Sequence, residues 1–88
     1  MYYIVVYDIA SPKRLPKMLK LMRGYLNHVQ YSVFEGELTN AQLAEVRHKA
    51  EVIMNEAEDS LIIYCVGNEK WLSREIVGIE KRGVSNFL

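Results

Sequence analysis

Apolar residues occur along this chain in two kinds of pattern, unbroken runs and helical stripes. Residues 1–8 read MYYIVVYD, a run of apolar and aromatic side chains that ends at Asp8 without a spacer. Three of these residues are β-branched, and a run of this kind is typical of a central strand with both faces covered. Residues 60–66, SLIIYCV, form a second such run. The sequence therefore predicts two strands at central positions in a sheet.

A helical stripe follows the first run. Ser11 is a candidate N-cap. Gly24 marks the expected end. The apolar positions recur at spacings of three and four residues and predict a face that packs on the core. They are Leu15, Met18, Leu19, Met22 and Leu26.

A second helix is predicted after Thr39. Thr39 and Gln42 have the spacing of a capping box, and apolar residues continue behind them at helical intervals. We expect this helix to cover about residues 40–57. Glu45 and Lys49 should form a favourable ion pair on its outer face, because residues four apart are neighbours on a helix surface.

The remaining segments predict further strands. Residues 29–38, VQYSVFEGEL, are rich in β-branched and aromatic side chains. They form either one kinked strand or two short strands with a tight turn or bulge near residues 33–36. Residues 74–79 are strand-like, and the apolar tail 84–88 is expected to pair with a sheet edge of its own or of a partner.

The order strand, helix, strand pair, helix, strand predicts an α+β fold, a ferredoxin-like βαββαβ sandwich with an extra C-terminal strand. No repeat or linker divides the chain, so we expect residues 1–88 to form one domain. Half of the residues are hydrophobic, which is much for a body of 88 residues to bury. A homodimer is therefore the expected state.

The composition also indicates the cellular compartment of the protein. Cys65 is the single cysteine in the sequence, which excludes an internal disulfide framework and fits a reducing environment. The N-terminal run lacks a basic region before it, and no stretch approaches the ~18 apolar residues of a membrane span. We expect a cytoplasmic protein that has no membrane partner.

Charge is distributed unevenly although the net charge is zero. Residues 1–34 hold five bases and one acid, whereas residues 35–60 hold seven acids and two bases. Four of the bases lie along one side of the first predicted helix, away from its apolar stripe. This pattern indicates either a solvated helix face or a ridge that contacts phosphates. The four bases are Lys13, Lys17, Lys20 and Arg23.

Asp8 is the main candidate for chemistry. Nucleotide-binding loops, zinc-ligand spacings and serine-hydrolase motifs do not occur in the sequence. An acid at a strand end is either a capping or turn residue, a general base or a metal ligand. One carboxylate holds Mg²⁺ weakly, because that ion usually takes one or two carboxylates with phosphate oxygens and water. Two copies of Asp8 that met at a dimer axis could share one ion.

Other polar residues are weaker candidates. Glu35 and Glu37 share one face of a strand and could add ligands, but a solvated hairpin explains them better. Asp59 is expected to be a turn residue. His28 and His48 have no acid or cysteine at a catalytic spacing, so we interpret them as surface or capped residues.

Two segments together resemble a known family. VVYDI at residues 5–9, a basic helix, and VQYSVFEGEL at residues 29–38 resemble the small CRISPR-associated protein family Cas two. The resemblance implies a ferredoxin-like homodimer in which each C-terminal strand, about residues 74–88, completes the partner's sheet. It also implies one Mg²⁺ ion per dimer, shared by the two Asp8 carboxylates, and hydrolysis of RNA or double-stranded DNA with Asp8 as the catalytic residue.

The resemblance further implies residues that handle the substrate. They match Arg14 and Lys17 of the basic helix and Ser32 and Phe34 of the second predicted strand region. Most aromatic residues are expected in the core or an interface, with Phe34 as the exception. The full set of nucleic-acid-binding candidates is Lys13, Arg14, Lys17, Lys20, Ser32 and Phe34.

Two functions compete on this basis. In one, the dimer is a Mg²⁺-dependent endonuclease, either an endoribonuclease or a DNase. In the other, which we favour as the cellular role, the dimer bridges the Cas one integrase and supports DNA during spacer acquisition. The alternatives are a toxin-like ribonuclease of the same fold and a DNA-binding scaffold without catalysis. A regulatory domain without a nucleic-acid role is the remaining interpretation.

Overall fold

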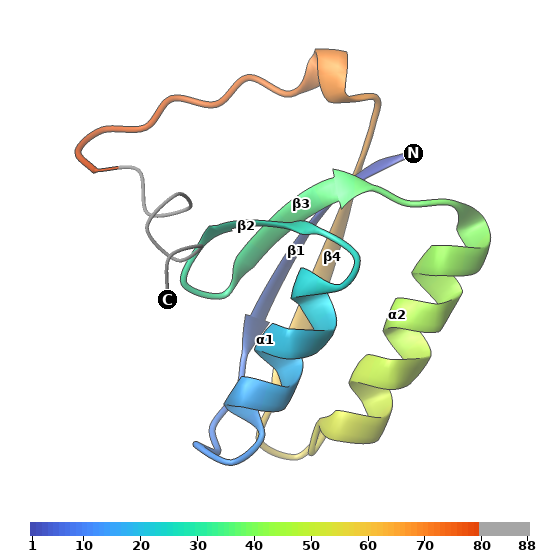
Figure 1. The fold of residues 1–88 in the computed structure, drawn as a ribbon, viewed down its shortest axis with the longest axis vertical. Helices are drawn as coiled ribbons and strands as arrows, with labels where there is room; N and C mark the ends of the chain where they lie inside the picture. The colour runs from blue at the N-terminus through green and yellow to red at the C-terminus, as the bar shows by residue number, and fades with distance from the viewer. Residues whose placement is uncertain (80–88) are drawn as a thin grey trace.

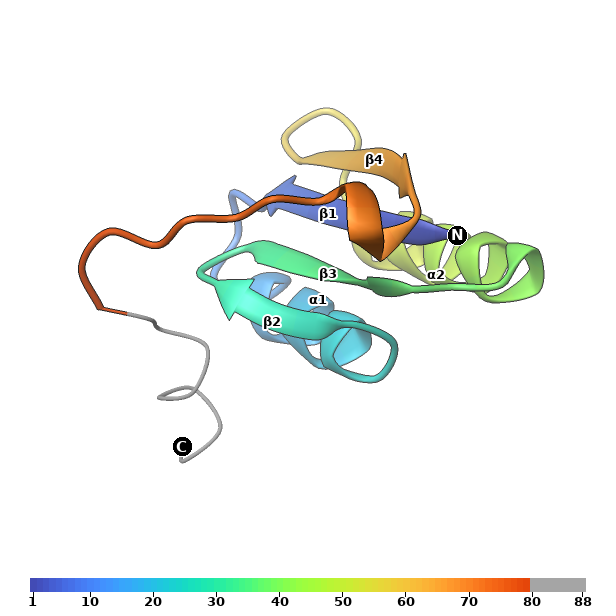
Figure 2. The same cartoon turned by 90° about the horizontal axis from the view of Figure 1, so that it is seen from above.

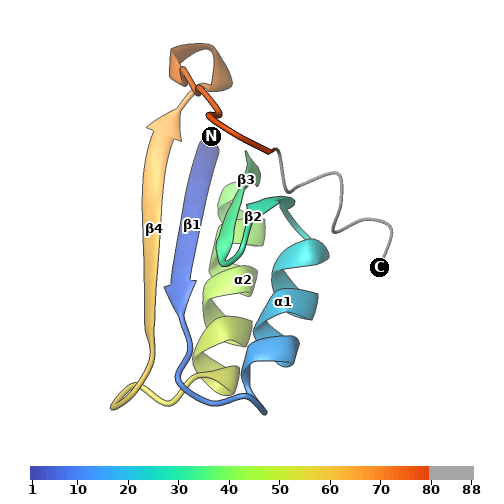
Figure 3. The same cartoon turned by 90° about the vertical axis from the view of Figure 1, so that its left-hand side faces the viewer.

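Two helices cover one face of an antiparallel sheet in the computed structural model, which describes residues 1–79 (Figure 1). Seen from the side, the sheet and the two helices form two layers (Figure 3). Within these residues the elements follow in the order β1 (Tyr2–Asp8), α1 (Leu15–Arg23), β2 (Asn27–Gln30), β3 (Val33–Glu37), α2 (Asn40–Ile53), β4 (Ser60–Gly67) and the 3₁₀ turn η1 (Glu69–Trp71).

The sheet has the strand order β2-β3-β1-β4, and neighbouring strands run antiparallel. β1 is central, as predicted, with Val5 opposite Phe34 on β3 and opposite Ile63 on β4. The order confirms the predicted α+β ferredoxin-like sandwich. The expected central position of residues 60–66 is wrong for the described part of the chain, because β4 lies at an edge of this sheet.

The core lies between the sheet and the helices. Alternate residues of β1 point toward the helices, as the two-residue period of a strand requires, and these are Tyr3, Val5 and Tyr7. The apolar stripe predicted for the first helix supplies Met18 and Met22, which are fully buried. The rest of this buried cluster comes from β3, from α2 and from the residues directly before β2 and after β3: Phe34, Val46, Ala50, Leu26 and Leu38.

The opposite face of the sheet is apolar and partly open. Ile4 and Val6 of β1 lie opposite Tyr64 and Ile62 of β4, respectively. The exposed fractions of Ile62 and Tyr64 are 47% and 54%. Because neither helix lies on this face (Figure 3), its apolar side chains face outward. We call this surface the open face.

β2 and β3 form a short hairpin. The structure has two strands, one of the two predicted alternatives, but the turn lies at Tyr31 and Ser32 and not within residues 33–36. Tyr31 adopts a φ of 42°, a left-handed conformation that is uncommon for a residue other than glycine. Gly36 lies inside β3, where an added Cβ would come within 3.1 Å of the Leu26 side chain.

The capping box of α2 is present as predicted. The Thr39 Oγ1 accepts a hydrogen bond from the Gln42 N–H at 3.1 Å, and the Thr39 N–H donates to Gln42 Oε1 at 2.9 Å. The predicted Glu45–Lys49 ion pair also forms, with an N···O distance of 3.1 Å. These local patterns are reliable because both partners belong to one helix.

One helix end and one helix cap differ from the prediction. α2 ends at Ile53 rather than near residue 57, and Asn55 starts a turn by accepting the Ala57 N–H at its Oδ1. Ser11 does not cap α1, which begins at Leu15 without a side-chain cap. The Ser11 hydroxyl instead accepts the Lys13 N–H at 3.1 Å, which orders the turn before the helix.

The segment after β4 leaves the sheet beside the N-terminus and then runs out past the edge of the sheet (Figure 2). Residues 72–79 form no strand within the described part of this protomer. The predicted strand at residues 74–79 is therefore not formed here, and its exchange with a partner stays a prediction. The predicted apolar tail at residues 84–88 lies outside the described residues.

Candidate functional site at the end of the central strand

Asp8 is the last residue of β1, and its side chain is exposed. It lies opposite Ser60, the first residue of β4. The hairpin turn reaches the same end of the sheet, because the Tyr7 N–H donates to the Ser32 carbonyl at 3.2 Å. The central strand thus places the Asp8 carboxylate at the rim of the sheet, near the predicted site residue Ser32.

The basic side of α1 begins close to this rim, since six residues connect Asp8 to the helix. Its bases are exposed and point away from the buried residues Met18 and Met22. No acidic residue lies in the first turn of the helix. This face, which we call the basic ridge, is open to a polyanion such as a phosphate backbone. It consists of Lys17, Lys20 and Arg23 on α1 and of Lys13 in the turn directly before the helix.

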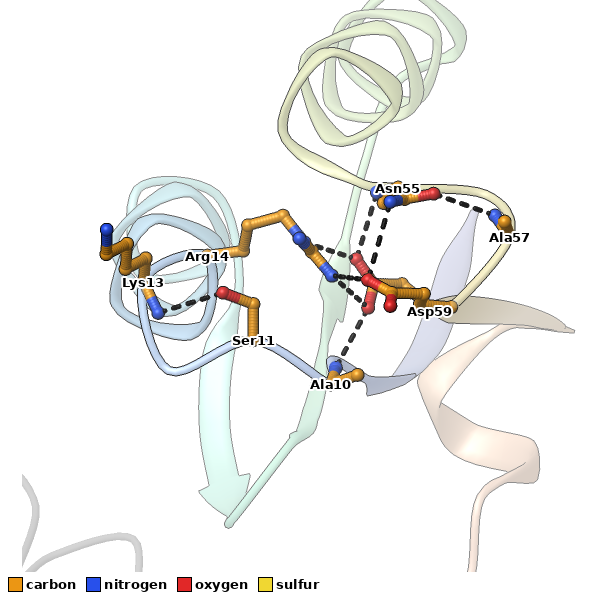
Figure 4. A network of polar contacts seen from close by, with 8 residues as sticks. Ala10, Ser11, Lys13, Arg14, Asn55, Ala57 and Asp59 are labelled. Carbon is orange, nitrogen blue, oxygen red and sulfur yellow. Dashed lines mark hydrogen bonds and ion pairs between the residues drawn. The ribbon is translucent and has the colours of Figure 1, made fainter.

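Arg14 differs from the basic ridge because it takes part in a local ion-pair network (Figure 4). Its Nε donates to Asp59 Oδ2 at 2.7 Å and its Nη2 donates to Asp59 Oδ1 at 3.0 Å, a two-pronged contact. Nη2 also donates to Glu58 Oε1 at 3.0 Å. The Arg14 side chain is 22% exposed, so the guanidinium is largely enclosed by its two acidic partners.

Asp59 is the centre of this network. The sequence predicted a turn residue, and the Asp59 carboxylate does accept the Asn55 N–H at 2.9 Å. It also accepts the Ala10 N–H at 2.8 Å, from the loop that follows β1. Its side chain is completely buried. Arg14, together with the N–H groups of Asn55 and Ala10, holds the pKa of the Asp59 carboxyl well below its usual range.

This pKa predicts acid sensitivity. Because the folded protein depresses the pKa of Asp59, its ionised form adds to the free energy of unfolding above about pH 4, the ordinary aspartate value. That contribution should be lost as the pH falls below about 4 toward the lowered pKa. Thermal unfolding at neutral and acidic pH measures the loss. Asp59→Asn should flatten the pH dependence of Tm, and an equally steep dependence would contradict the assignment.

Phe34 lies in the core and not on a binding surface. Its side chain has no exposed area, and its ring stacks on His28 at 4.4 Å between centroids with 7° between the planes. Tyr7 stacks on it from β1 at 6.0 Å. The prediction that Phe34 contacts nucleic acid directly does not hold in this structure, because the ring has no accessible surface. His28, expected at the surface or capped, is packed against this ring.

Glu35 is also buried, which contradicts the expectation of a solvated hairpin. Its carboxylate accepts the Tyr2 hydroxyl at 2.6 Å and pairs with Arg74 from the segment after η1. Burial and this hydrogen bond raise the pKa of Tyr2. Glu37 is exposed and pairs with the N-terminal amine at 2.6 Å. Neither acid lies near Asp8. On β3, Glu35 is opposite Ile4 and Glu37 is opposite Tyr2, toward the other end of β1.

A single protomer supplies few metal ligands at this rim. Within residues 1–79, no group of three or more histidine, cysteine, aspartate or glutamate side chains is arranged to hold a metal ion. Asp8 alone suits an ion that takes its other ligands from a second copy, from phosphate oxygens or from water. Asp8 therefore fits Mg²⁺ as one ligand among several, the others coming from outside this group of side chains.

Sequence reasoning missed two of the long-range ion pairs in the described residues, those that involve a buried carboxylate. Arg14 and Asp59 are 45 residues apart, and Glu35 and Arg74 are 39 residues apart. The usable signal for Asp59 was its place directly before an apolar strand, where a carboxylate enters the core edge and needs partners. For Glu35, the signal was an acid inside an apolar strand region.

The fold and its exposed strand-end acid place this chain among ferredoxin-like two-layer domains, a class that serves many functions. The family described as CRISPR associated protein Cas2 matches residues 1–74, and the chain belongs to this family. This result confirms the resemblance found in the sequence. In the described residues, helices are too short or too polar to cross a membrane.

Individual relatives agree with the family match. The chain is 44% identical to the CRISPR-associated endoribonuclease Cas2 of Dictyoglomus turgidum over 92% of each protein. It is 36% identical to the protein of that name from Methanosarcina acetivorans over the full length of both. The crystal structure of Streptococcus pyogenes Cas2 at pH 6.5 superimposes with a TM-score of 0.80 at 34% identity, covering 89% of this chain and all of that one.

Proposed function

We propose that this chain acts in CRISPR adaptation as a homodimer that bridges the Cas one integrase and supports DNA during spacer acquisition. We further propose that it has a Mg²⁺-dependent endonuclease capacity through Asp8. The observation that supports both is the arrangement at one end of the sheet, where the exposed Asp8 carboxylate lies a short loop away from the basic ridge. The endoribonuclease names of the relatives support the cleavage capacity. We place the protein in the cytoplasm, in keeping with its single cysteine.

In this proposal, the basic ridge binds the phosphate backbone and sets its direction. Exposed Lys13, Lys17 and Lys20 provide the contacts, and such contacts position a nucleic acid without reading its sequence. Asp8 is the metal ligand and, with its copy from the second protomer, completes the site. The chemistry that Mg²⁺ supplies when bound is activation of water and stabilisation of charge on the phosphodiester.

A homodimer is supported by the open face. Ile62 and Tyr64 expose about half of their surface there, next to Ile4 and Val6 of the central strand. Apolar residues gathered on one face favour burial against a second protein surface. Because Asp8 has the strand parity of Ile4 and Val6, burying this face between two copies would bring the two Asp8 side chains to the same interface.

Ile62→Glu is therefore expected to convert the dimer into a monomer, because the new charge would be buried at the interface. Sedimentation velocity or light scattering on a sizing column measures the mass. Val52→Glu is the matched control, since Val52 is 73% exposed on α2, away from the open face. If both variants have the mass of the native protein, the open face is not the dimer interface.

A scaffold without catalysis is the second candidate. It is favoured by the small number of metal ligands at the rim, where β1 ends in one exposed carboxylate, Asp8, and residues 1–79 hold no group of three or more potential metal ligands. A bridge between integrase dimers needs the basic ridge and the dimer, but it does not need Asp8. The two candidates therefore make different demands on the same residue.

The native protein separates these candidates in two parallel assays. Cleavage of labelled single-stranded RNA and double-stranded DNA is followed with Mg²⁺ and with a chelator, and spacer integration is followed with the integrase present. Chelator-sensitive cleavage supports the endonuclease capacity. Integration that depends on the protein, without cleavage, supports the scaffold alone. Failure in both assays, with no binding to either nucleic acid, would overturn the proposed function.

A further inference from the structure

The Asp59 carboxylate ties together three separate segments of the chain. It accepts hydrogen bonds from the loop after β1 at Ala10, from the residue before α1 at Arg14, and from the turn after α2 at Asn55 (Figure 4). Both of its oxygens are used twice within this network. A buried carboxylate with this many partners is held in one position, because any movement breaks several hydrogen bonds at once.

Two of these segments are the ends of the connection between Asp8 and α1, which also carries Lys13 of the basic ridge. Ala10 lies two residues after Asp8, and Arg14 lies immediately before the first residue of α1. In addition, Ser60 follows Asp59 directly and lies opposite Asp8 in the β1–β4 ladder. The carboxylate thus fixes the connection at both ends and is anchored to the strand beside Asp8.

Arg14 is poorly suited to contact a phosphate. Its Nε and Nη2 are engaged by carboxylates, and two acids, Asp59 and Glu58, surround its single positive charge. The local charge is therefore negative and disfavours an approaching polyanion. To turn Nε and Nη2 toward a phosphate, the guanidinium would have to leave a completely buried carboxylate without a countercharge, which is strongly unfavourable.

We propose that Arg14 and Asp59 form a positioning pair that sets the Asp8 carboxylate relative to Lys13 and Lys17 on the basic ridge, and that Arg14 does not bind nucleic acid. The inference rests on the proposed function for the roles of Asp8 and the lysines. It changes the role of Arg14 from a substrate contact to a residue that acts through the fold of the loop. Cleavage then requires the pair, whereas phosphate binding requires the lysines.

The first test compares Arg14→Gln with Lys17→Gln in nucleic-acid binding over a series of salt concentrations. Lys17→Gln should weaken binding and lower the slope of log K against log salt by about one, as expected when one phosphate contact is lost. Arg14→Gln should leave the slope unchanged. An equal loss of slope in Arg14→Gln would overturn the proposal, because it would identify Arg14 as a phosphate contact.

The second test measures cleavage kinetics. Arg14→Gln and Asp59→Asn should each lower kcat by about 10- to 100-fold with little change in KM, because a small displacement of a reacting group has an effect of this size. The double variant should be no worse than either single variant, since both remove one interaction. Arg14→Lys should not restore kcat, because an ammonium cannot make the two-pronged contact. Native kcat in Arg14→Lys or Asp59→Asn would overturn the proposal.

A third measurement does not depend on any activity. Hydrogen exchange of the Ala10 amide should accelerate in Arg14→Gln, while exchange at Val5 in the core of β1 stays slow. A merely general loss of stability would accelerate both. If the native protein neither binds nor cleaves nucleic acid, the proposed function fails, but this local change would still support the pair. Unchanged exchange at Ala10 would overturn the pair itself.

Discussion

Asp8→Asn is expected to reduce Mg²⁺-dependent cleavage by about 100-fold or more, because loss of a metal ligand should exceed the 10- to 100-fold effect seen for groups that only support ligands. The substitution keeps the shape of the side chain and removes its charge. Since Asp8 is exposed at the end of β1, the fold should tolerate the change with an effect within about 0.5 kcal/mol on the free energy of unfolding. Cleavage rates over a Mg²⁺ titration measure the effect.

The matched control is Glu37→Gln, which removes an exposed carboxylate at the opposite end of the same sheet. It should retain native cleavage. Binding of nucleic acid should survive in Asp8→Asn, because the basic ridge is intact. Unchanged cleavage in Asp8→Asn would contradict the metal site, whereas lost cleavage with native spacer integration would show that bridging does not use the carboxylate.

Much of the fold could be predicted because its signals are local. The apolar run before Asp8 predicted a central strand, and the Thr39–Gln42 capping box predicted the start of α2. Both depend on residues close in sequence, where periodicity and capping are decisive. The predicted end of α2 was several residues too late. The chain turns at Asn55, whose side chain accepts the Ala57 N–H and whose own N–H donates to the Asp59 carboxylate.

The edge position of β4 shows a different limit. Its run of apolar residues is typical of a strand covered on both faces, yet Ile62 and Tyr64 are exposed in the described protomer. An apolar run predicts that both faces of the strand are buried, but it does not predict whether the same chain or a second protein buries them. In the proposed homodimer, the second copy covers this face. The sequence pattern then reflects the assembly and not the protomer.

The candidate site was predictable in its position but not in its connections. Asp8 stands out because it ends an apolar run. Arg14, in contrast, is a base in the same stretch of sequence as the lysines of the basic ridge. Only the folded structure shows that Arg14 is paired with Asp59. Sequence spacing can predict which side of a helix a base occupies, but not a partner 45 residues away.

Phe34→Ala is expected to remove a large part of the stability of the fold. The ring is completely buried between Tyr7 and His28, so its loss should cost about 3–5 kcal/mol through lost burial and the cavity left behind. Domains of this size have a free energy of unfolding of only about 4–13 kcal/mol. The midpoint of unfolding in urea should therefore fall sharply, or the variant should be partly unfolded in buffer.

Phe34→Leu is the control that separates a core role from a binding role. Leucine keeps an apolar side chain and much of the volume, so this variant should lose far less stability than Phe34→Ala. Because the ring has no exposed surface, nucleic-acid binding in both variants should follow the folded fraction determined from the unfolding curve. A Phe34→Leu variant that is fully folded, with its native mass, but binds nucleic acid markedly more weakly would show that the ring reaches the substrate after all. Binding in proportion to the folded fraction would instead show that Phe34 acts through the packing of β1 against β3. The same packing holds Asp8 at the rim of the sheet.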